Sequence, residues 1–338
     1  MSKRTFIGIF ILIVIIVAGI GIWFIPKFLR KPIGPFKKVT LASMPHSFTG
    51  YSVFVALENG YFQDEGVDVM LQTTYPHGKA ILQAVIDGEA DLGTSSETPF
   101  MHAVLNGGEL YALATMLTAE KHLAIVARKD SGIFAAQDLK GKTIGVTPGT
   151  NGEYFLDTVL LLHGISREEI QAVHLKPGQM FDALMNAGVD AIATWNPQMY
   201  QAQKELGDQG SVFYAEGLYA ASFVIAARQE YVHTNPDIIE RVVRSLVHAS
   251  QFIREHPAES REIVAHYLKM DESLLKELSA IYHFKIALDQ SFLLTLENQT
   301  EWAIEHHLTD QIRVPNYLDF VYPDALEVVE PESVTIIR

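Results

Sequence analysis

Apolar positions follow two different periods along residues 39–93, and the pattern predicts strands that alternate with helices. Residues 39–42, 67–71 and 91–93 are short apolar runs typical of strands. Residues 51–62 and 79–86 instead place an apolar side chain at every third or fourth position, as amphipathic helices do. A β-α-β-α-β alternation indicates a parallel sheet with helices covering its faces, so we expect an α/β fold.

A second strand-to-helix junction is expected at residues 142–155. Residues 143–146 form a short apolar run, Thr147-Pro148-Gly149 a turn, and Thr150 or Asn151 the cap of a helix. The N–H groups of a helix N-terminus can hold an anion or another polar group. The glycine spacing matches neither G-x-G-x-x-G nor a P-loop. Two interpretations stay open, a ligand-binding loop and an ordinary turn.

An internal repeat suggests that this alternation occurs twice. Residues 81–91 match residues 180–190 in residue type at an offset of 99, with Ala84/Ala183 and Asp91/Asp190 identical. We interpret the copies as parts of two similar lobes, with chance similarity as the competing explanation. Apolar runs at 110–126 and 218–227 bracket the second copy and are candidate strand pairs or crossovers. From Pro236 onward helical periodicity dominates, and these helices are expected on the outside of a lobe.

The first 38 residues differ in character from the rest. Residues 6–25 are twenty uncharged, mostly apolar positions between basic residues, which is enough for a helix to cross a bilayer core of roughly 30 Å. The stretch is longer than the apolar core of a signal peptide and has no small-x-small site after it, so we expect an uncleaved anchor over 1–30 and a linker over 31–38. Basic residues are denser after this segment, which by itself favours a cytoplasmic body.

Composition narrows the function further. The 338 residues are 48% hydrophobic, typical of a globular protein with room for two domains, and contain no cysteine, which excludes disulfides, thiol nucleophiles and Cys-ligated metals. Seven of the 26 basic and none of the 40 acidic residues lie in the first 38 positions. The remaining body is therefore strongly acidic and should not bind nucleic acid.

Four motifs occur in an order that resembles a known family. They are L-E-N-G-Y-F-x-x-E-G-V-D-V at 57–69, G-E-A-D-L-G at 88–93, T-P-G-T at 147–150, and V-D-A-x-x-x-W-x-P at 189–197. Together they resemble the substrate-binding proteins of ABC importers for nitrate, sulfonates, taurine or bicarbonate, and their relatives that bind thiamine pyrimidine precursors. The resemblance is rich in motifs over 38–227 and looser beyond. An apparent membrane anchor, in place of a cleaved signal or a lipidated cysteine, departs from common members.

The resemblance implies a periplasmic-binding-protein type II fold, in which two lobes joined by two crossovers close over a ligand. We expect residues 39–127 with 218–338 to form the first lobe and 128–217 the second. The resemblance also implies an extracytoplasmic body that docks on an ABC permease with its ATPase. We expect a plasma-membrane location through the N-terminal helix, a monomer, and no cofactor, metal site or catalytic residue.

In such a protein the ligand would meet the loops that follow the strands. The candidate ligand-binding residues are Ser43, His46, Ser47, Tyr75, His77, Ser95, Ser96 and Glu97 from the first lobe, and Thr147, Thr150, Asn151, Gly152, Trp195 and Asn196 from the second.

Three side-chain types among these candidates have two interpretations each. Trp195 could stack on a ligand or simply pack. His46 and His77 could bind an anion or be merely exposed. Glu97 could favour a cationic ligand, or it could stabilise the first turn of a helix in T-x-x-E spacing from Thr94. No arginine lies in these loops, which weakens a sulfonate or nitrate assignment relative to a ligand bound by amides, hydroxyls and aromatic rings.

Two other functions compete with a transport component. An enzyme is disfavoured because H-E-x-x-H and G-x-S-x-G are absent, and because the cysteine-rich iron motif of the pyrimidine synthases that share the fold is missing. A membrane-tethered ligand sensor is the other alternative, and it would need a partner protein to carry the signal.

Overall fold

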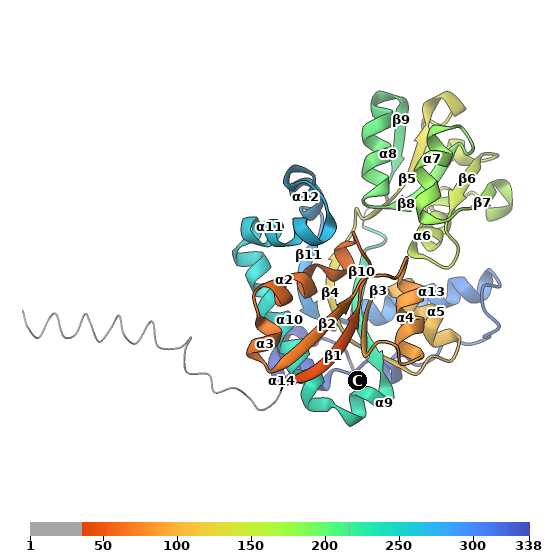
Figure 1. Ribbon diagram of the computed structural model, residues 1–338. Helices are drawn as coiled ribbons and strands as arrows, with labels where there is room; N and C mark the ends of the chain where they lie inside the picture. Colours follow the sequence, from red (N-terminus) through yellow and green to blue (C-terminus); the bar gives the residue numbers. More distant parts are fainter. Residues whose placement is uncertain (1–35, 216) are drawn as a thin grey trace, which may run out of the picture.

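Two β-sheets, each flanked by helices, make up the computed structural model, which describes residues 36–215 and 217–338 (Figure 1). The first sheet contains six strands: β1 (Lys37–Ala42), β2 (Val67–Gln72), β3 (Leu92–Ser96), β4 (Leu110–Ala119), β10 (Ala221–Arg228) and β11 (His283–Ala287). The second contains five: β5 (Leu123–Arg128), β6 (Thr143–Val146), β7 (Gln171–His174), β8 (Ala191–Trp195) and β9 (Gly210–Phe213). We call each sheet with its helices a lobe.

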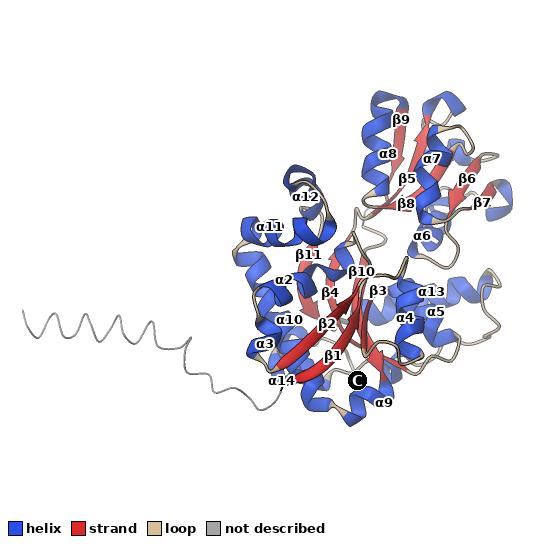
Figure 2. Cartoon of the chain, in the orientation of Figure 1, coloured by secondary structure: helices blue, strands red, loops and turns tan. Residues whose placement is uncertain are grey.

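Helices surround both sheets, as Figure 2 shows. In the first lobe they are α2 (Tyr51–Glu58), α3 (Tyr61–Asp64), α4 (Gly78–Ile86), α5 (Glu97–Leu105), α9 (Gln229–Thr234), α10 (Pro236–Glu255), α11 (Pro257–Leu268), α12 (Glu272–Ser279), α13 (Gln290–Glu305) and α14 (Asp324–Val329). In the second they are α6 (Asn151–Leu162), α7 (Met180–Met185) and α8 (Gln198–Leu206).

The two sheets share one strand order over five positions. The order is β2-β1-β3-β10-β4 in the first and β7-β6-β8-β5-β9 in the second, with β11 added at the edge of the first beside β4. The first three strands run parallel in each sheet, and the fourth is antiparallel to the third. The two α/β lobes expected from the alternation are therefore confirmed as the fold.

The internal repeat occupies equivalent places in the two lobes. It covers most of α4 and the turn that leads into β3 in one, and α7 and the turn that leads into β8 in the other. Asp91 Oδ2 accepts a hydrogen bond from the Thr40 backbone N–H at 2.7 Å, and Asp190 Oδ2 accepts one from the Thr143 N–H at 2.9 Å. Each aspartate thus joins the start of its strand to the central parallel strand, which explains why both copies keep this residue.

Two arginines at the ends of the antiparallel strands repeat the same geometry. Arg228, at the end of β10, donates to the Ala90 carbonyl at 3.1 Å, and Arg128, at the end of β5, donates to the Val189 carbonyl at 3.0 Å. Ala90 lies just before β3, the strand that pairs with β10, and Val189 lies just before β8, the strand that pairs with β5. In each lobe, an arginine on the antiparallel strand therefore binds the turn at the end of the repeat.

The lobe boundary expected at residues 127/128 differs from the observed strand pairing. β5 pairs with β8 and β9 of the second sheet, so the first crossover lies between β4 and β5, after Ala119 and before Leu123. The polar residues Glu120-Lys121-His122 interrupt the apolar run at 110–126 at this crossover. The strands on either side are buried on both faces, so they carry no periodicity that shows which sheet each one joins.

Two further local expectations need correction. The single helix expected at 51–62 is two helices, because Gly60 adopts a left-handed φ of 73° between α2 and α3. The edge strand β11 was not expected, since residues 283–287 follow a helical region and pair only with β4.

The C-terminal helices pack on the first lobe, as expected, with α10 against α2 and α14 (Figure 1). In the part of the chain that the structure describes, no helix combines the length and apolar character needed to span a membrane. The expected anchor at 6–25 and most of the linker at 31–38 lie outside the described residues.

Candidate functional site

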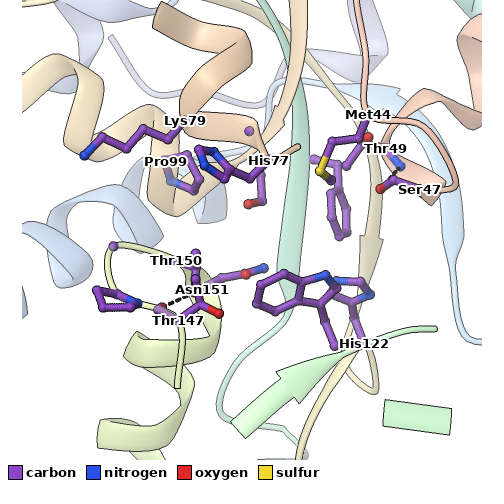
Figure 3. A pocket seen from close by; sticks show the side chains of 16 residues that line it. Met44, Ser47, Thr49, His77, Lys79, Pro99, His122, Thr147, Thr150 and Asn151 are labelled. Atoms are coloured by element: carbon purple, nitrogen blue, oxygen red, sulfur yellow. Dashed lines mark hydrogen bonds between the residues drawn. The ribbon is translucent and has the colours of Figure 1, made fainter. Parts of the chain in front are cut away.

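A cleft of about 340 Å³ lies between the two lobes and receives residues from both. The first lobe supplies Met44, Ser47, Thr49, His77, Gly78, Lys79, Ser96, Pro99 and Phe223, the second supplies Thr147, Pro148, Gly149, Thr150, Asn151 and Trp195, and His122 comes from the crossover. Figure 3 shows His77 and Thr49 on one side of the cleft, with Thr150 and Asn151 opposite them.

Helix N-termini from both lobes meet at this cleft. α4 begins at Gly78 and α6 at Asn151, and both residues line it, while Ser96 directly precedes α5. The N–H groups of a first helical turn have no partner within the helix, and the helix dipole makes this end positive. Convergence of such ends creates a place for negative charge.

Local contacts keep these helix ends in position. His77 Nδ1 accepts from the Ala80 N–H at 3.2 Å, and Thr150 donates to the Thr147 carbonyl at 2.7 Å. Gly78 is required by space, because a Cβ there would lie 2.3 Å from Ser95 Oγ. Gly149 is required by conformation, since its φ is 67°.

The charge balance of the cleft also favours an anion. None of its sixteen lining residues, all within the described chain, is an aspartate or glutamate. Lys79 is the lone lysine or arginine among them, and Figure 3 shows its ammonium group directed away from Thr49, so it acts from the rim. Within the interior, the N-terminus of α4 is the clearest source of positive potential, because α5 and α6 carry Glu97 and Glu153 in their first turns.

The hydroxyl of Thr49 is a polar group in the cleft wall that lacks a hydrogen-bond partner. It is buried, and the residue lines the cleft. A buried polar group without a partner costs roughly 1–3 kcal/mol. Trp195, Phe223 and Met44 provide apolar surface in the same cleft. The site therefore suits an oxyanion carrying a small organic group.

Half of the fourteen candidate residues line the cleft: Ser47, His77, Ser96, Thr147, Thr150, Asn151 and Trp195. Among the other first-lobe candidates, Ser43 is buried and accepts from Thr94 Oγ1 at 2.9 Å. His46 Nδ1 lies 2.9 Å from the Leu268 carbonyl oxygen. Tyr75 donates to Gln72 at 2.9 Å. Their polar groups are thus used within the fold.

The remaining candidates lie behind the cleft wall. Ser95 is buried beside Gly78, and Gly152 packs beneath Trp195, whose Cζ3 would lie 3.2 Å from a Cβ added at 152. Asn196 is buried, and its backbone N–H donates to the His122 carbonyl at 3.2 Å. Alternation of side chains along β3 turns Ser95 inward, whereas the next residue, Ser96, faces the cleft.

Glu97 differs most from its possible role as a ligand contact. It stands in the first turn of α5, fully buried, and its carboxylate accepts from the Tyr219 hydroxyl, from the Ser222 N–H at 2.9 Å and from Gln299 at 3.2 Å. Burial raises the pKa of Glu97 above its usual value. With Glu97 turned inward, the argument for a cationic ligand no longer holds.

Several cleft residues escaped the sequence reasoning: Met44, Thr49, Lys79, Pro99, His122 and Phe223. The first four adjoin loops that were selected, so extending each loop by a few residues would have found them. His122 and Phe223 lie at the crossover and on the antiparallel strand β10. Their place depends on long-range pairing, for which the local sequence carries no signal.

His122 is the most strongly perturbed titratable group in the cleft wall. Its Nδ1 lies 2.7 Å from the Tyr282 hydroxyl, and burial lowers its pKa from 6.5 to about 3. The folded state therefore keeps this imidazole neutral, whereas the unfolded chain takes up a proton below pH 6.5. Stability from this group is complete above pH 6.5 and is lost as the pH falls towards 3.

We expect His122→Asn to flatten this acid dependence, since an Asn oxygen can still accept from Tyr282 but cannot titrate. Between pH 6.5 and 5 the wild type should lose about 1.6 kcal/mol more unfolding free energy than the variant, because the slope approaches 1.36 kcal/mol per pH unit only below pH 6.5. Urea unfolding at both pH values measures this. The exposed His266 provides the control, His266→Asn, and equal slopes for wild type and His122→Asn would contradict the expectation.

A chain of polar contacts links the cleft loop to the other lobe. Glu153 accepts from the Gly149 N–H at 2.8 Å through one oxygen and lies 3.3 Å from Arg167 through the other. Arg167 also pairs with Asp157 Oδ1, and Asp157 Oδ2 accepts from the Trp302 indole at 2.8 Å. Trp302 belongs to α13, so the second-lobe loop is connected to the first lobe.

Comparison with known proteins adds to this geometry. Residues 47–260, more than half of the chain, match the family model described as NMT1/THI5 like. A protein of Brucella abortus (strain 2308), named as a binding protein, is 24% identical over 227 residues, covering 66% of this chain and 69% of that protein. One of Escherichia coli (strain K12), named as an aliphatic sulfonates-binding protein, is 26% identical over 191 residues, covering 56% and 60%.

Solved structures show the same fold at lower identity. The periplasmic aliphatic sulphonate binding protein SsuA from Escherichia coli superposes with a TM-score of 0.73 at 18% identity, covering 86% of this chain and 98% of that chain. The alkanesulfonate-binding protein SsuA from Xanthomonas axonopodis pv. citri, bound to MOPS, gives 0.70 at 19% identity, covering 86% and 98%. The periplasmic-binding-protein-like fold implied by the sequence motifs is thereby confirmed.

Proposed function

The chain belongs to the NMT1/THI5-like family, and from this membership together with its cleft we propose that it is the solute-binding component of an ABC importer. Its ligand is a small organic oxyanion of the sulfonate class, held between the lobes. The observation that carries the proposal is the meeting of helix N-termini from both lobes in a cleft that no carboxylate lines. The names of the sulfonate-binding relatives support it.

Each part of such a ligand has a matching part of the site. The oxyanion would lie between the ends of α4 and α6, within reach of the Thr49 hydroxyl, because the N–H groups of the helix ends and this unpartnered hydroxyl donate hydrogen bonds to an anion. The organic group would contact Trp195 and Phe223. We assign ligand contact to the seven cleft-lining candidates and to Thr49.

The mechanism would be lobe closure rather than chemistry. Side chains of both lobes face one cleft, so a ligand bridging them would favour the closed arrangement, which a permease could recognise. Binding of this kind places the body outside the cytoplasm, with an ABC permease and ATPase as partners. A ligand-independent role or turnover of the bound compound would contradict this mechanism.

The direct test is thermal unfolding of the full chain, in mild detergent and Tris chloride, with short alkanesulfonates, taurine, nitrate, bicarbonate and aminopyrimidines. Sulfonate buffers must be avoided, since they are candidate ligands themselves. A ligand at 100 times its Kd should add about 2.7 kcal/mol to stability. Stabilisation by an aminopyrimidine but by no sulfonate would overturn the ligand class.

Thr49→Val gives this test a residue-level signature. Removing a hydroxyl that has no partner should leave the ligand-free protein equally stable or more stable. The affinity for the oxyanion should nevertheless fall about tenfold, because one charge-assisted hydrogen bond is lost. Isothermal titration calorimetry measures the affinity. Thr158→Val is the matched control, because that hydroxyl bonds the Tyr154 carbonyl within α6 and lies outside the cleft. Unchanged affinity in Thr49→Val would remove Thr49 from the site.

A further inference from the structure

A second pocket, of about 380 Å³, lies in the first lobe between the end of α10, the start of α11 and α12. Figure 1 shows α11 and α12 next to each other on this lobe. The pocket is lined by Tyr51, Ile253, Arg254, Pro257, Ser260, Arg261, Lys276, Ser279, Ala280, Tyr282 and Phe284. It shares none of these residues with the cleft between the lobes.

Three cations gather in this pocket without a carboxylate. Arg254, Arg261 and Lys276 line it, and no aspartate or glutamate does. Within the described chain none of the three forms an ion pair, whereas five other arginines each contact a carboxylate: Arg128, Arg167, Arg241, Arg244 and Arg338. The protein has a formal net charge of −14, so three cations that form no ion pair make this pocket opposite in charge to the chain as a whole.

Arg261 is the residue that most needs an acceptor. Its Nε–H is sealed from solvent and has no hydrogen-bond partner in the structure. A buried charged donor without an acceptor is more costly than a neutral one, so native proteins normally supply a partner from the chain or from a bound group. By contrast, Arg254 already donates to Ser250 Oγ at 2.7 Å and to the Phe284 carbonyl at 3.2 Å.

Hydroxyl groups and a helix end complete the surroundings. Ser260 is buried, with its Oγ 3.3 Å from the Tyr51 hydroxyl, and it donates to the Pro257 carbonyl at 3.1 Å. Ser279, on α12, donates to the Lys276 carbonyl at 3.3 Å. Pro257 and Ser260 stand in the first turn of the twelve-residue α11, whose N-terminus adds partial positive charge. The guanidinium and ammonium donors, beside this helix end, match the several oxygens of a tetrahedral oxyanion.

We propose that this pocket is a second anion site, which binds a doubly charged tetrahedral oxyanion of the phosphate type, as the free ion or as the terminal group of a small ester. Arg261 is its central ligand, with Lys276 and Arg254 neutralising the second charge. The inference does not depend on the function assigned to the cleft.

The test follows the Arg261 Nε–H signal in side-chain ¹H–¹⁵N spectra of the full chain while inorganic phosphate is added. Chloride keeps the ionic strength constant. We expect one arginine signal, absent from Arg261→Gln, to shift with saturation, and phosphate affinity to fall at least tenfold in Arg261→Gln. Arg313→Gln removes the same charge from an exposed arginine outside the pocket and should bind phosphate like the wild type.

Three outcomes would overturn the second site. The first is equal phosphate affinity in wild type and Arg261→Gln, and the second is an equal shift of the arginine signal with chloride alone. The third is a loss of phosphate affinity in Thr49→Val, which would place the anion in the cleft between the lobes. Glycerol phosphate, titrated in parallel, distinguishes the sources, since tighter binding than inorganic phosphate identifies an ester as the occupant.

Discussion

Replacing Glu97 by alanine is expected to lower the free energy of unfolding by about 3–5 kcal/mol, the range for removing one member of a buried polar network. Three donors would lose their acceptor at once: the Tyr219 hydroxyl, the Ser222 N–H and the Gln299 amide. All three donor residues are buried, and Glu97 itself is fully buried. Urea unfolding followed by circular dichroism measures the loss.

Glu97→Gln separates the hydrogen bonds from the shape of the side chain. It keeps one acceptor oxygen and the packing volume, so its loss should be smaller than that of the alanine variant. Glu89→Ala, at an exposed position near the start of β3, is the control and should stay within about 0.5 kcal/mol of the wild type. If Glu97→Ala were as stable as the wild type, the carboxylate would not hold this network together.

The second large effect is expected from Asp157→Ala, which removes the link between the lobes. Asp157 binds Arg167 with one oxygen and the Trp302 indole with the other, and it is largely buried. Its loss should cost about 3 kcal/mol in unfolding free energy, because a partly buried guanidinium and an indole N–H lose their acceptor. Chemical unfolding measures this part.

Asp157→Ala should also lower the affinity of the cleft for its ligand by about tenfold. Arg167 would no longer be held from two sides, and Glu153, which fixes the Gly149 N–H at the cleft, would lose its support. Trp302→Phe keeps the ring against Tyr154 but removes the N–H donor, so it should reproduce part of the affinity loss at a smaller cost in stability. Calorimetry gives both affinities.

Asp182→Ala, at an exposed position of α7, is the matched control for this pair of measurements. A large stability loss in Asp157→Ala with unchanged ligand affinity would show that the network only supports the fold. If Asp157 only stabilised the second lobe, Trp302→Phe should leave ligand affinity unchanged, because Trp302 lies in the first lobe and outside the cleft. A loss of affinity in Trp302→Phe would therefore support the link between the lobes.

The sequence alone determined the elements and their duplication. Helical and strand periods, turn residues and caps are local properties, so the strands at β1, β2 and β6 and the helices at α4, α6 and α10 could be predicted closely. The repeat ending in Asp91 and Asp190 predicted two similar lobes. The structure gives the physical reason for the repeated residue, since each aspartate accepts a hydrogen bond from the central parallel strand of its own lobe. The junction at Thr147–Asn151, for which local chemistry left a ligand-binding loop and an ordinary turn open, lines the cleft between the lobes.

Strand pairing and side-chain direction were decided only by the tertiary structure. Apolar runs that are buried on both faces look alike, so local sequence does not show which sheet β5 joins or that His122 and Phe223 reach the cleft. These placements depend on pairing with residues 64 to 72 positions away for β5 with β8, and 127 to 135 positions away for β10 with β3. Glu97 and Ser96 are neighbours in one junction, yet Ser96 lines the cleft and Glu97 turns into the core. The donors that hold Glu97 there come from residues 219, 222 and 299, which no local pattern connects to it, so its role required the folded chain.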